Sequence, residues 1–408
     1  MRAARPAPLL AALLLCGGLL AGCGKGSSSG SAAGPARKVA PVSPAGAVSV
    51  VTRNTTRLGG ADVATDAASV ARTVYPGLDT ASRPQVVVVV NERDWAAALA
   101  ASVLAGAPLN APILYSEGNV LPPVSREALE ALHPLGAPSL EGTQVIEIGT
   151  TAALPKGYLA RSLPNAEPAT VAVALEHLWT SAGTTNPHQV IAVAADTPHP
   201  LQMPAASLAA ESGAPILFLA PGHVPIATIA LLKSLHHPAI YVIDPSSVSR
   251  PTLDGLRRLG AVTEIPDSSS GEATGPSANS IAVARFTDGQ FGWGVKEPGH
   301  GLVFASALRP LDAPAAAPLS ATADYGPLLL LEEPGQIPAG LAKYLGDIKS
   351  AAYSNSYRYR PAVGSYNRGW LLGDESTISG VVQAEIDSVL EISVTNQPTG
   401  ESAAPQAE

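Results

Sequence analysis

Short runs of aliphatic residues recur along the chain, and each run is continuous rather than alternating. They occupy residues 86–90, 111–115 and 144–148, then 189–194, 214–219 and 239–243, and finally 302–305, 327–331 and 369–372. Runs this short and this apolar are typical of parallel strands buried on both faces. Their intervals are mostly about 25 to 32 residues, enough for a crossover helix and two loops. The pattern predicts an α/β fold and excludes an all-antiparallel one.

The segments between the runs carry helix signals. Residues 95–105 are rich in alanine and leucine and are followed by Gly106. Polar residues that can open or cap the other helices stand before them: Ser125, Ser249, and Ser376 or Thr377. Short strand-like pieces are expected at the seams, over 48–52, 157–162, 262–265 and 390–394.

One local pattern returns three times. Its copies are Asn110-Ala111-Pro112-Ile113-Leu114, Gly213-Ala214-Pro215-Ile216-Leu217 and Tyr325-Gly326-Pro327-Leu328-Leu329, with starts 103 and 112 residues apart. An alanine-rich stretch stands upstream of each copy. Self-similarity at a near-constant period indicates a repeat architecture. We therefore expect three related Rossmann- or flavodoxin-like parallel-sheet units.

The first 22 residues are expected to direct export. Arg2 and Arg5 precede an unbroken run of apolar and small residues over 9–21. A helix of that length rises about 20 Å, short of the ~30 Å hydrocarbon core, so the run predicts a signal peptide rather than a membrane span. Leu20-Ala21-Gly22-Cys23 resembles a bacterial lipobox, which makes Cys23 the expected lipidated residue. The alternative is an ordinary secretory signal with a chance cysteine.

The other cysteine, Cys16, lies in the part to be removed, so the mature chain would have no internal disulfide. Residues 23–47 are rich in glycine, serine, alanine and proline. They predict a flexible tether with a reach of about 25 Å.

Composition narrows the function classes. Charged residues make up 14% of the chain and hydrophobic residues 46%, but aromatic residues only 4%. Disorder throughout is excluded, and the core must be built mainly from aliphatic side chains. The net charge is −8, and −10 once Arg2 and Arg5 are removed, which argues against a nucleic-acid partner. Any binding of a polyanion must therefore be local, through arginines in a cleft.

The first copy resembles the cell-wall-binding repeat 2 family, whose modules hold surface-layer proteins on Gram-positive walls. The residues that carry the resemblance are Arg57-Leu58-Gly59-Gly60-Ala61-Asp62, 86–90, 94–101, Ala111-Pro112-Ile113-Leu114, Leu121-Pro122 and 145–150. Family members carry such repeats in threes. The resemblance implies three units around a pseudo-threefold axis and binding of an anionic wall polymer. It places Arg57 and Asp62 on the ligand side.

The sequence also departs from the family pattern. Val63 replaces the second basic residue of the first motif, and Trp95-Ala96-Ala97 stands where the family has Phe-Pro-Asp. The second copy has Asn165-Ala166-Glu167-Pro168 at the place of the arginine motif, and the third has Thr274-Gly275-Pro276-Ser277. The ligand-side resemblance is therefore confined to the first copy.

These observations predict a division of the chain. The expected parts are a signal peptide at 1–22, a tether at 23–47, repeat units at 48–160, 161–266 and 276–394, a linker at 267–275 and a disordered tail at 395–408.

No enzyme motif is found, and we expect no cofactor and no metal. His236-His237 stands at an expected helix end, since adjacent side chains diverge and cannot form an i, i+4 zinc pair. Asp196 with His199 is a weak metal suggestion, and a polar loop is the preferred interpretation. Glu332-Glu333 follows a strand, where α/β folds place sites, but a solvated loop is preferred there too.

The interval before the last run of the third copy is longer than in the other copies and holds tyrosines and arginines. Tyr357, Arg358, Tyr359, Arg360, Tyr366 and Arg368 are candidates for polymer binding. Arginine gives bidentate contacts to phosphate or carboxylate, and tyrosine offers a flat apolar face. A plain surface extension explains the segment equally well.

The sequence thus predicts a non-enzymatic, lipid-anchored protein on the extracytoplasmic face of the cell membrane. Its expected partner is an anionic cell-wall polysaccharide or teichoic-type polymer. Two alternatives stay open: a solute-binding lipoprotein of a transporter, which would have two lobes and a hinge, and a scaffold for an envelope protein partner.

Overall fold

The computed structural model describes residues 46–184, 188–196, 200–266, 275–321, 326–349 and 366–391. The expected signal peptide and lipidated Cys23 lie outside these ranges, as do most of the tether, most of the linker at 267–275 and the tail. The same holds for His199 and for four of the candidate binding residues: Tyr357, Arg358, Tyr359 and Arg360.

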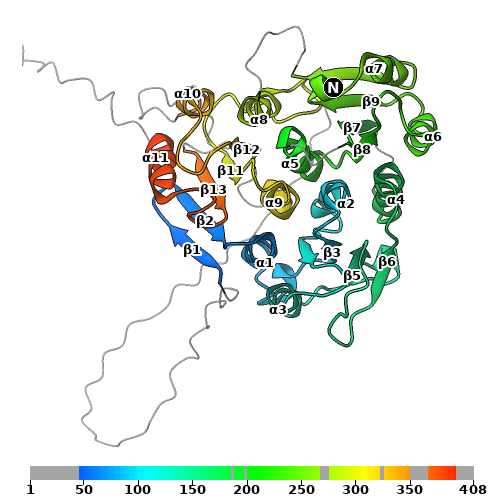
Figure 1. Cartoon of the computed structure of the whole chain (residues 1–408). Coiled ribbons are helices and arrows are strands. Elements are labelled where there is room, and N and C mark those ends of the chain that lie inside the picture. The colour runs from blue at the N-terminus through cyan, green and yellow to red at the C-terminus, as the bar shows by residue number, and fades with distance from the viewer. Residues whose placement is uncertain are drawn as a thin grey trace, which may run out of the picture. The chain divides into compact units, whose positions relative to one another are not determined.

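Three sheets form the framework (Figure 1). The first has the order β4-β3-β5-β6, from Ile113–Ser116, Val87–Asn91, Val145–Ile148 and Ala160–Leu163. The second has the order β10-β9-β7-β8, from Ala261–Ile265, Ala239–Ile243, Gln189–Ala194 and Ile216–Leu219. The third has the order β1-β2-β13-β11-β12, from Val48–Val51, Thr55–Gly59, Arg368–Leu372, Gly301–Ser306 and Leu328–Leu331.

All strand pairs are parallel except β1 with β2. Each of the nine aliphatic runs falls on a strand, as predicted. The α/β fold of repeated parallel-sheet units is thereby confirmed, while the rotational relation among the units remains a prediction.

The helices connect and cover these strands. They are α1 Val63–Val74, α2 Trp95–Ala101, α3 Pro123–Leu132, α4 Pro168–Ser181, α5 Pro204–Ser212, α6 Ile226–Ser234, α7 Arg250–Arg257, α8 Pro276–Arg285, α9 Asp312–Ala321, α10 Ala339–Asp347 and α11 Gly380–Leu390. The 3-10 helix η2, Ser102–Ala105, extends α2. None of the helices that the structure describes combines the length and apolar character needed to span a bilayer.

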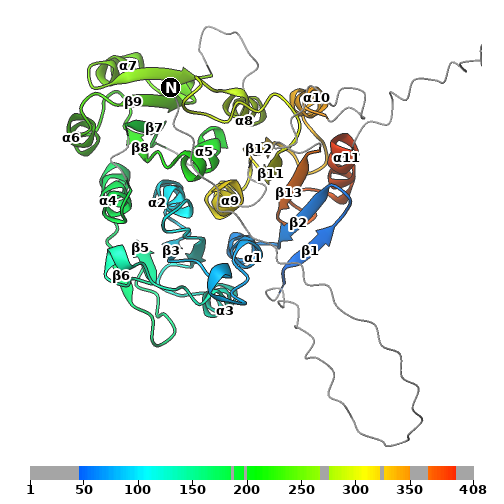
Figure 2. The same ribbon diagram turned by 180° about the vertical axis from the view of Figure 1, so that it is seen from behind.

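In each sheet, one strand belongs to the segment that leads into the next repeat. β6 pairs with β5 and then leads into α4, which packs on β8 of the second sheet. β10 pairs with β9 and then leads, through residues that include the linker, to α8, which packs on β12 of the third sheet. β2 pairs with β13 and leads into α1, which packs on β4 of the first sheet. The series is therefore a closed ring, and Figure 2 shows β1 and β2 beside β13.

This closure changes one expectation. We placed residues 48–59 at the start of the first unit, but both of their strands lie in the third sheet. The register aligns Thr55 with Gly369 and Leu58 with Leu372. Parallel pairing with a strand more than 300 residues away leaves no signal in the local pattern, because periodicity specifies a strand and not its partner.

The three alanine-rich helices meet at the centre of the described structure. Figure 1 shows α2, α5 and α9 surrounded by the sheets. Ala105, Ala210 and Ala317 form a buried cluster of their own, one from each repeat. Gly106 lets the chains approach closely, since a Cβ there would stand 2.7 Å from the Ala210 carbonyl oxygen. Small side chains therefore set the packing distance at the centre.

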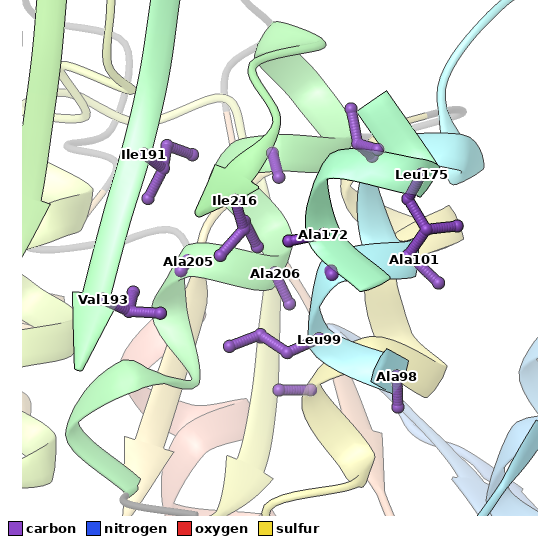
Figure 3. Packing of buried hydrophobic residues seen from close by; sticks show 14 of the residues in the cluster. Ala98, Leu99, Ala101, Ala172, Leu175, Ile191, Val193, Ala205, Ala206 and Ile216 are labelled. Atoms are coloured by element: carbon purple, nitrogen blue, oxygen red, sulfur yellow. The ribbon is translucent and has the colours of Figure 1, made fainter. Parts of the chain in front are cut away.

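A larger core surrounds this centre and joins residues of all three sheets. Figure 3 shows part of it, where Leu99 of the first repeat lies among Ala172, Ala206 and Ile216 of the second. The core is mainly aliphatic, as the low aromatic content predicted. The chain from Val42 onward forms one unit by its internal contacts, and a division into two lobes is not seen among the described residues.

Candidate functional site

Polar groups from the first and third repeats meet where three strands of the third sheet end. β2 ends at Gly59, β13 at Leu372 and β11 at Ser306, so their carboxyl ends lie at one edge of the sheet. This is the edge where open α/β sheets place their sites. We call the group there the closure site, formed by Arg57, Gly60, Asp62, Asp66, Arg309, Asp312, Asp374 and Thr377.

Arg57 is enclosed by the closure site, with 1% of its surface exposed. Its Nε donates to Gln383 Oε1 at 2.9 Å, and Nη1 donates to the carbonyl oxygens of Gly373 and Asp374 at 3.0 and 2.9 Å. Nη2 donates to the Ile378 carbonyl oxygen at 2.6 Å. These acceptors use the donors of the guanidinium, so Arg57 has none to offer a polymer. We had expected it to contact ligand, and its contacts instead join β2 to the loop after β13 and to α11.

Asp62 is exposed and caps α1. Its carboxylate accepts from the Thr65 N–H at 2.8 Å and from Thr65 Oγ1 at 2.9 Å. The pKa of Glu92 is raised, mainly by burial and then by the negative charges of Glu117 and Asp62. The charge of Arg93 opposes this rise. This part of the surface is therefore dominated by carboxylates. Asp62 has a local reason to be present, as a helix cap, independent of any ligand.

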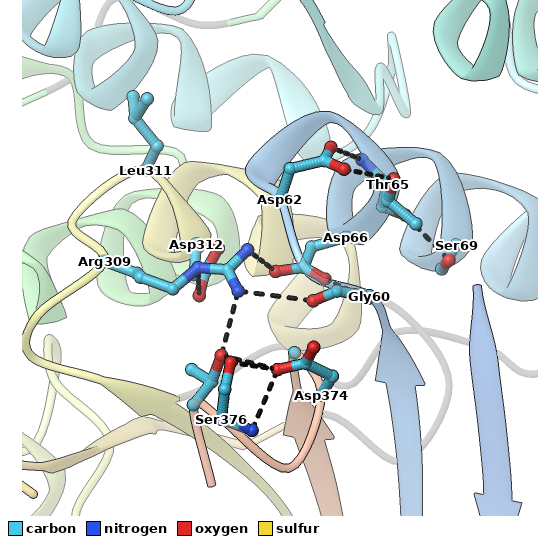
Figure 4. A network of polar contacts seen from close by, with 12 residues as sticks. Gly60, Asp62, Thr65, Asp66, Ser69, Arg309, Leu311, Asp312, Asp374 and Ser376 are labelled. Atoms are coloured by element: carbon cyan, nitrogen blue, oxygen red, sulfur yellow. Dashed lines mark hydrogen bonds and ion pairs between the residues drawn. The ribbon is translucent and has the colours of Figure 1, made fainter. Parts of the chain in front are cut away.

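Arg309 is the hub of the closure site (Figure 4). Nη2 forms an ion pair with Asp66, and Nη1 donates to the Gly60 carbonyl oxygen at 3.3 Å and to Thr377 Oγ1 at 2.9 Å. Nε lies 3.3 Å from Asp312 Oδ2. One arginine of the third repeat thus holds α1 of the first repeat, the loop after β2 and the loop after β13.

The charges of the closure site do not balance. Asp66 and Asp312 are both wholly buried, and among the described residues Arg309 is the one cation paired with them, while the Gly60 N–H also donates to Asp66 Oδ1 at 2.6 Å. Burial is the largest cause that raises the pKa of both carboxyls, and the charge of Asp312 raises that of Asp66 further. Two carboxylates beside one guanidinium in a dry site favour retention of a proton. Tyr115 borders the site and donates from its hydroxyl to the Leu311 carbonyl oxygen at 2.7 Å.

A second polar surface lies on β13, on the opposite face of the sheet from Arg57. We call it the β13 surface, formed by Tyr366, Arg368, Trp370 and Thr56. The Arg368 guanidinium carbon lies 5.1 Å from the centre of the Trp370 ring, and Nη2 donates to Thr56 Oγ1 at 3.3 Å. Tyr366 is 56% exposed. Among the described residues, no carboxylate lies within ion-pair distance of Arg368, so its charge is available.

The structure therefore separates the predicted binding residues. Arg57 and Arg368 lie on neighbouring strands but on opposite faces of the third sheet, since Arg368 contacts Thr56 and successive side chains alternate. Asp62 lies beyond the carboxyl end of β2. Sequence reasoning missed Asp66, Arg309 and Asp312. Asp312 is the first residue of the alanine-rich helix α9, and an acidic residue beside so apolar a helix was the one sequence signal that could have indicated a buried carboxyl.

Three further expectations concern loops. Glu332 and Glu333 lie in the loop after β12, where Glu333 is exposed, but the half-buried Glu332 accepts through Oε1 from the Ser277 N–H at 3.1 Å in the first turn of α8. His236 and His237 follow the end of α6, and both have left-handed backbone angles. Asp196 is exposed, and its candidate partner lies outside the described residues. Within the described ranges, no group of three or more His, Cys, Asp or Glu side chains could hold a metal ion.

Comparison with known proteins supports the repeat interpretation. Residues 57–158 match the family Cell wall binding domain 2 (CWB2), so the resemblance expected for the first copy is confirmed. The matched segment begins at Arg57 on β2 and ends just before β6, so it includes β3, β4 and β5 of the first sheet. No curated protein sequence matches the chain.

Two solved structures share the fold. Cwp6 from Clostridium difficile has a TM-score of 0.59 at 17% identity, over 83% of this chain and 48% of that one. Cwp8 from Clostridium difficile has a TM-score of 0.58 at 14% identity, over 83% of this chain and 52% of that one. The chain thus spans about half the length of each. At these identities the likeness shows the fold alone.

Proposed function

We propose that this chain is a non-enzymatic cell-envelope protein that binds an anionic cell-wall polymer. The observation that carries the proposal is the match of residues 57–158 to a cell-wall-binding family. The fold shared with Cwp6 and Cwp8 supports three repeats built on that module. A solute-binding role would call for two lobes around a cleft, and the continuous core that joins all three sheets gives no support to it.

The β13 surface is the part of the described chain best suited to an anionic polymer. No carboxylate of the described residues pairs with Arg368, and stacking on Trp370 fixes its guanidinium without using all its donors. The exposed Tyr366 adds flat apolar area of the kind that packs on sugar rings, while the half-buried Trp370 supports the Arg368 guanidinium. Tyr357, Arg358, Tyr359 and Arg360, the other candidates of this segment, lie outside the described residues.

The closure site is a poorer candidate for direct contact. Its arginines are both used internally, and the exposed Asp62 and the half-buried Asp374 are acidic. An anionic polymer would meet repulsion there at close range. In our proposal the family motif of the first copy serves to close the ring, and the polymer binds on the third repeat.

A test of the proposal compares single charge removals. Arg368→Ala should weaken binding of the mature protein to purified wall fragments about tenfold, since a charge-assisted hydrogen bond contributes ~1.5–3 kcal/mol. Arg161→Ala removes the same charge from an exposed strand in another sheet and is the matched control. Equal loss in both variants would mean that only net charge matters. No loss in either, with wild-type binding intact, would place the contact elsewhere.

We further propose that Cys23 carries a lipid that holds the protein on the extracytoplasmic face of the membrane. The support is the lipobox-like Leu20-Ala21-Gly22-Cys23 after a run of apolar residues. Cys23→Ser should abolish partition of the mature protein into a detergent phase. Normal partition of that variant would contradict lipidation at this cysteine.

A further inference from the structure

The edges of the three sheets differ in whether another strand could pair with them. One edge of each sheet is covered by a helix: β4 by α1, β8 by α4 and β12 by α8. At β12 two N–H groups that point away from β11 are also hydrogen-bonded, because Leu328 N donates to Ser207 Oγ at 3.3 Å and Leu330 N to Ser280 Oγ at 3.1 Å. These edges are not open to another strand.

The opposite edges are β6, β10 and β1, and only β1 lacks a charge. β6 carries the exposed Arg161, and β10 carries Glu264, which is bonded to Arg257. Charged residues on edge strands oppose pairing with other chains. β1 reads Val48-Ser49-Val50-Val51, with Val50 43% and Val51 64% exposed. In the described part of the chain, β1 has β2 on one side and no strand on the other.

The hairpin geometry identifies the free backbone groups of β1. Thr52 and Thr55 close the turn, and Thr52 N donates to the Thr55 carbonyl oxygen at 2.9 Å. Hydrogen-bonded and non-bonded pairs alternate in an antiparallel ladder, so Val50 opposite Arg57 bonds to β2 as well. The N–H and C=O of Ser49 and Val51 must therefore point outward.

We propose that β1 pairs with β1 of a second copy of this chain, antiparallel, about a twofold axis at Val50. Ser49 of one copy would then exchange two hydrogen bonds with Val51 of the other, and the symmetry gives four bonds in all. Val50 would face its own counterpart as a non-bonded pair. The exposed side chains of Val50 and Val51 would be covered, and the two third sheets would form one continuous sheet.

A second copy fits this edge for three reasons. Antiparallel pairing of identical strands is self-complementary and closes after two subunits, without further growth. The charge beside each strand is also neutralised, since Arg53 pairs with Glu391, so two copies would meet without isolated like charges.

The third reason rests on the proposed anchoring. The tether expected at 23–47 leads directly into β1, so lipid-anchored copies would present this strand at a similar height above one membrane. A four-residue edge buries far less than the ~800 Å² per partner of a standard interface, so the pair should be weak in dilute solution. Confinement to a membrane raises the effective concentration and favours it.

Disulfide trapping tests the proposal, because the mature chain would otherwise hold only Cys23. The Cα atoms of a non-bonded antiparallel pair lie about 4.5 Å apart, within the range that a disulfide spans. In membranes from cells that express the full chain, Val50→Cys should form a dimer of twice the chain mass on mild oxidation. Ser162→Cys on the guarded edge β6 is the matched control and should give about tenfold less dimer.

Two blocking variants, each in the Val50→Cys background, check the pairing mode. Ser49→Pro removes an outward N–H that the fold does not use, and Val51→Lys adds the charge that the other edges carry. Both should abolish the dimer. Dimer that survives both variants would overturn edge pairing, and so would equal dimer from Ser162→Cys or a cross-link to a protein of different mass.

The test is independent of polymer binding. Ser49→Pro should bind wall fragments like the wild type, because Ser49 pairs with Leu58, two residues along β2 from the Thr56 that Arg368 contacts. If lipidation fails, Cys23→Ser with Val50→Cys can be oxidised in concentrated solution, where the same dimer is expected. No dimer in either setting would overturn the proposal, whatever the outcome for the wall polymer.

Discussion

Arg57 illustrates what a buried arginine needs in order to stabilise a fold. Burial lowers its pKa, the charges of Glu375 and Asp374 oppose this, and its donors all find acceptors. A buried charge left without partners would be strongly unfavourable. The sequence identified this residue as special through its motif but assigned it to ligand, because a motif does not say whether its arginine faces solvent or backbone carbonyls.

At this scale we expect Arg57→Ala to lower the free energy of unfolding by about 3 kcal/mol, since several buried carbonyl oxygens would lose their donors. Arg57→Lys keeps the charge but not the fork of donors, so its free energy of unfolding should lie between those of the wild type and Arg57→Ala. Urea denaturation followed by circular dichroism measures both. A variant that keeps wild-type stability yet loses polymer binding would return Arg57 to the ligand side.

The pair Asp66 and Asp312 predicts a dependence of stability on pH. Both carboxyls have pKa values above that of an ordinary aspartate, so the folded state binds more protons than the unfolded state at neutral pH. Stability should then fall as the pH rises above about 4, by up to about 1.4 kcal/mol per pH unit for one proton. The charged groups that face the pair are Arg309 on the loop before α9 and, when ionised, Tyr115 on β4.

Asp66→Asn tests this, because the amide is neutral at every pH and is nearly isosteric with the protonated acid. The melting temperature of the variant should vary less between about pH 5 and pH 9 than that of the wild type. Asp254→Asn is the control, since that carboxylate is exposed and paired with Arg257 on the surface. An unchanged pH slope in Asp66→Asn would show that the pair does not retain the extra proton.

At the scale of elements, the sequence predicted strands well and caps less well. Continuous aliphatic runs identified nine strands, because a strand buried on both faces has no polar positions that would interrupt its hydrophobic pattern. Ser249 caps α7 as expected, but α11 begins at Gly380 with Ser379 as its cap, not Ser376 or Thr377. Ser125 lies inside α3, where its hydroxyl donates to the Tyr115 carbonyl oxygen. Several polar residues in a row make the local choice of cap ambiguous.

The central helices give a prediction about packing. Gly106→Val should destabilise the protein by about 1–3 kcal/mol, because its Cβ would stand 2.7 Å from the Ala210 carbonyl oxygen. Gly346→Ala within α10 is the control, with open space at its Cβ and a gain in helix propensity. Thermal melting of both variants checks the contrast. Equal melting temperatures would mean that the centre can relax without loss.

At the scale of the whole molecule, the sequence predicted three parallel-sheet units and the structure has three sheets, but the closure of these sheets into a ring left no signal in the sequence. Spacing and the recurrent Ala-Pro-Ile-Leu pattern gave three units. The exchange of fourth strands depends on pairings between distant segments, such as β2 with β13, and on helices that pack on the next sheet. The closure site was missed for the same reason, since Arg309 and Asp66 are 243 residues apart.

Shared strands and a continuous core predict that the three units unfold together. The chain offers tryptophans in each: Trp95 and Trp179 pack on the large core in the first and second repeats, and Trp370 lies on β13. Variants that each keep one of these as the single tryptophan should show coincident urea transitions by fluorescence. Separate midpoints would mean that the repeats fold as independent domains.

The exchange of strands also bears on how such a chain can change over evolutionary time. A repeat in an open array can be gained or lost with little effect on its neighbours, but here each repeat supplies a strand that the sheet before it lacks. Deletion of one repeat would leave two sheet edges without their partner strands, so the number of repeats cannot change freely. A copy is then retained for its strand whether or not it still reads a ligand. This accounts for a chain in which two repeats lack the arginine motif while all three have the strand framework.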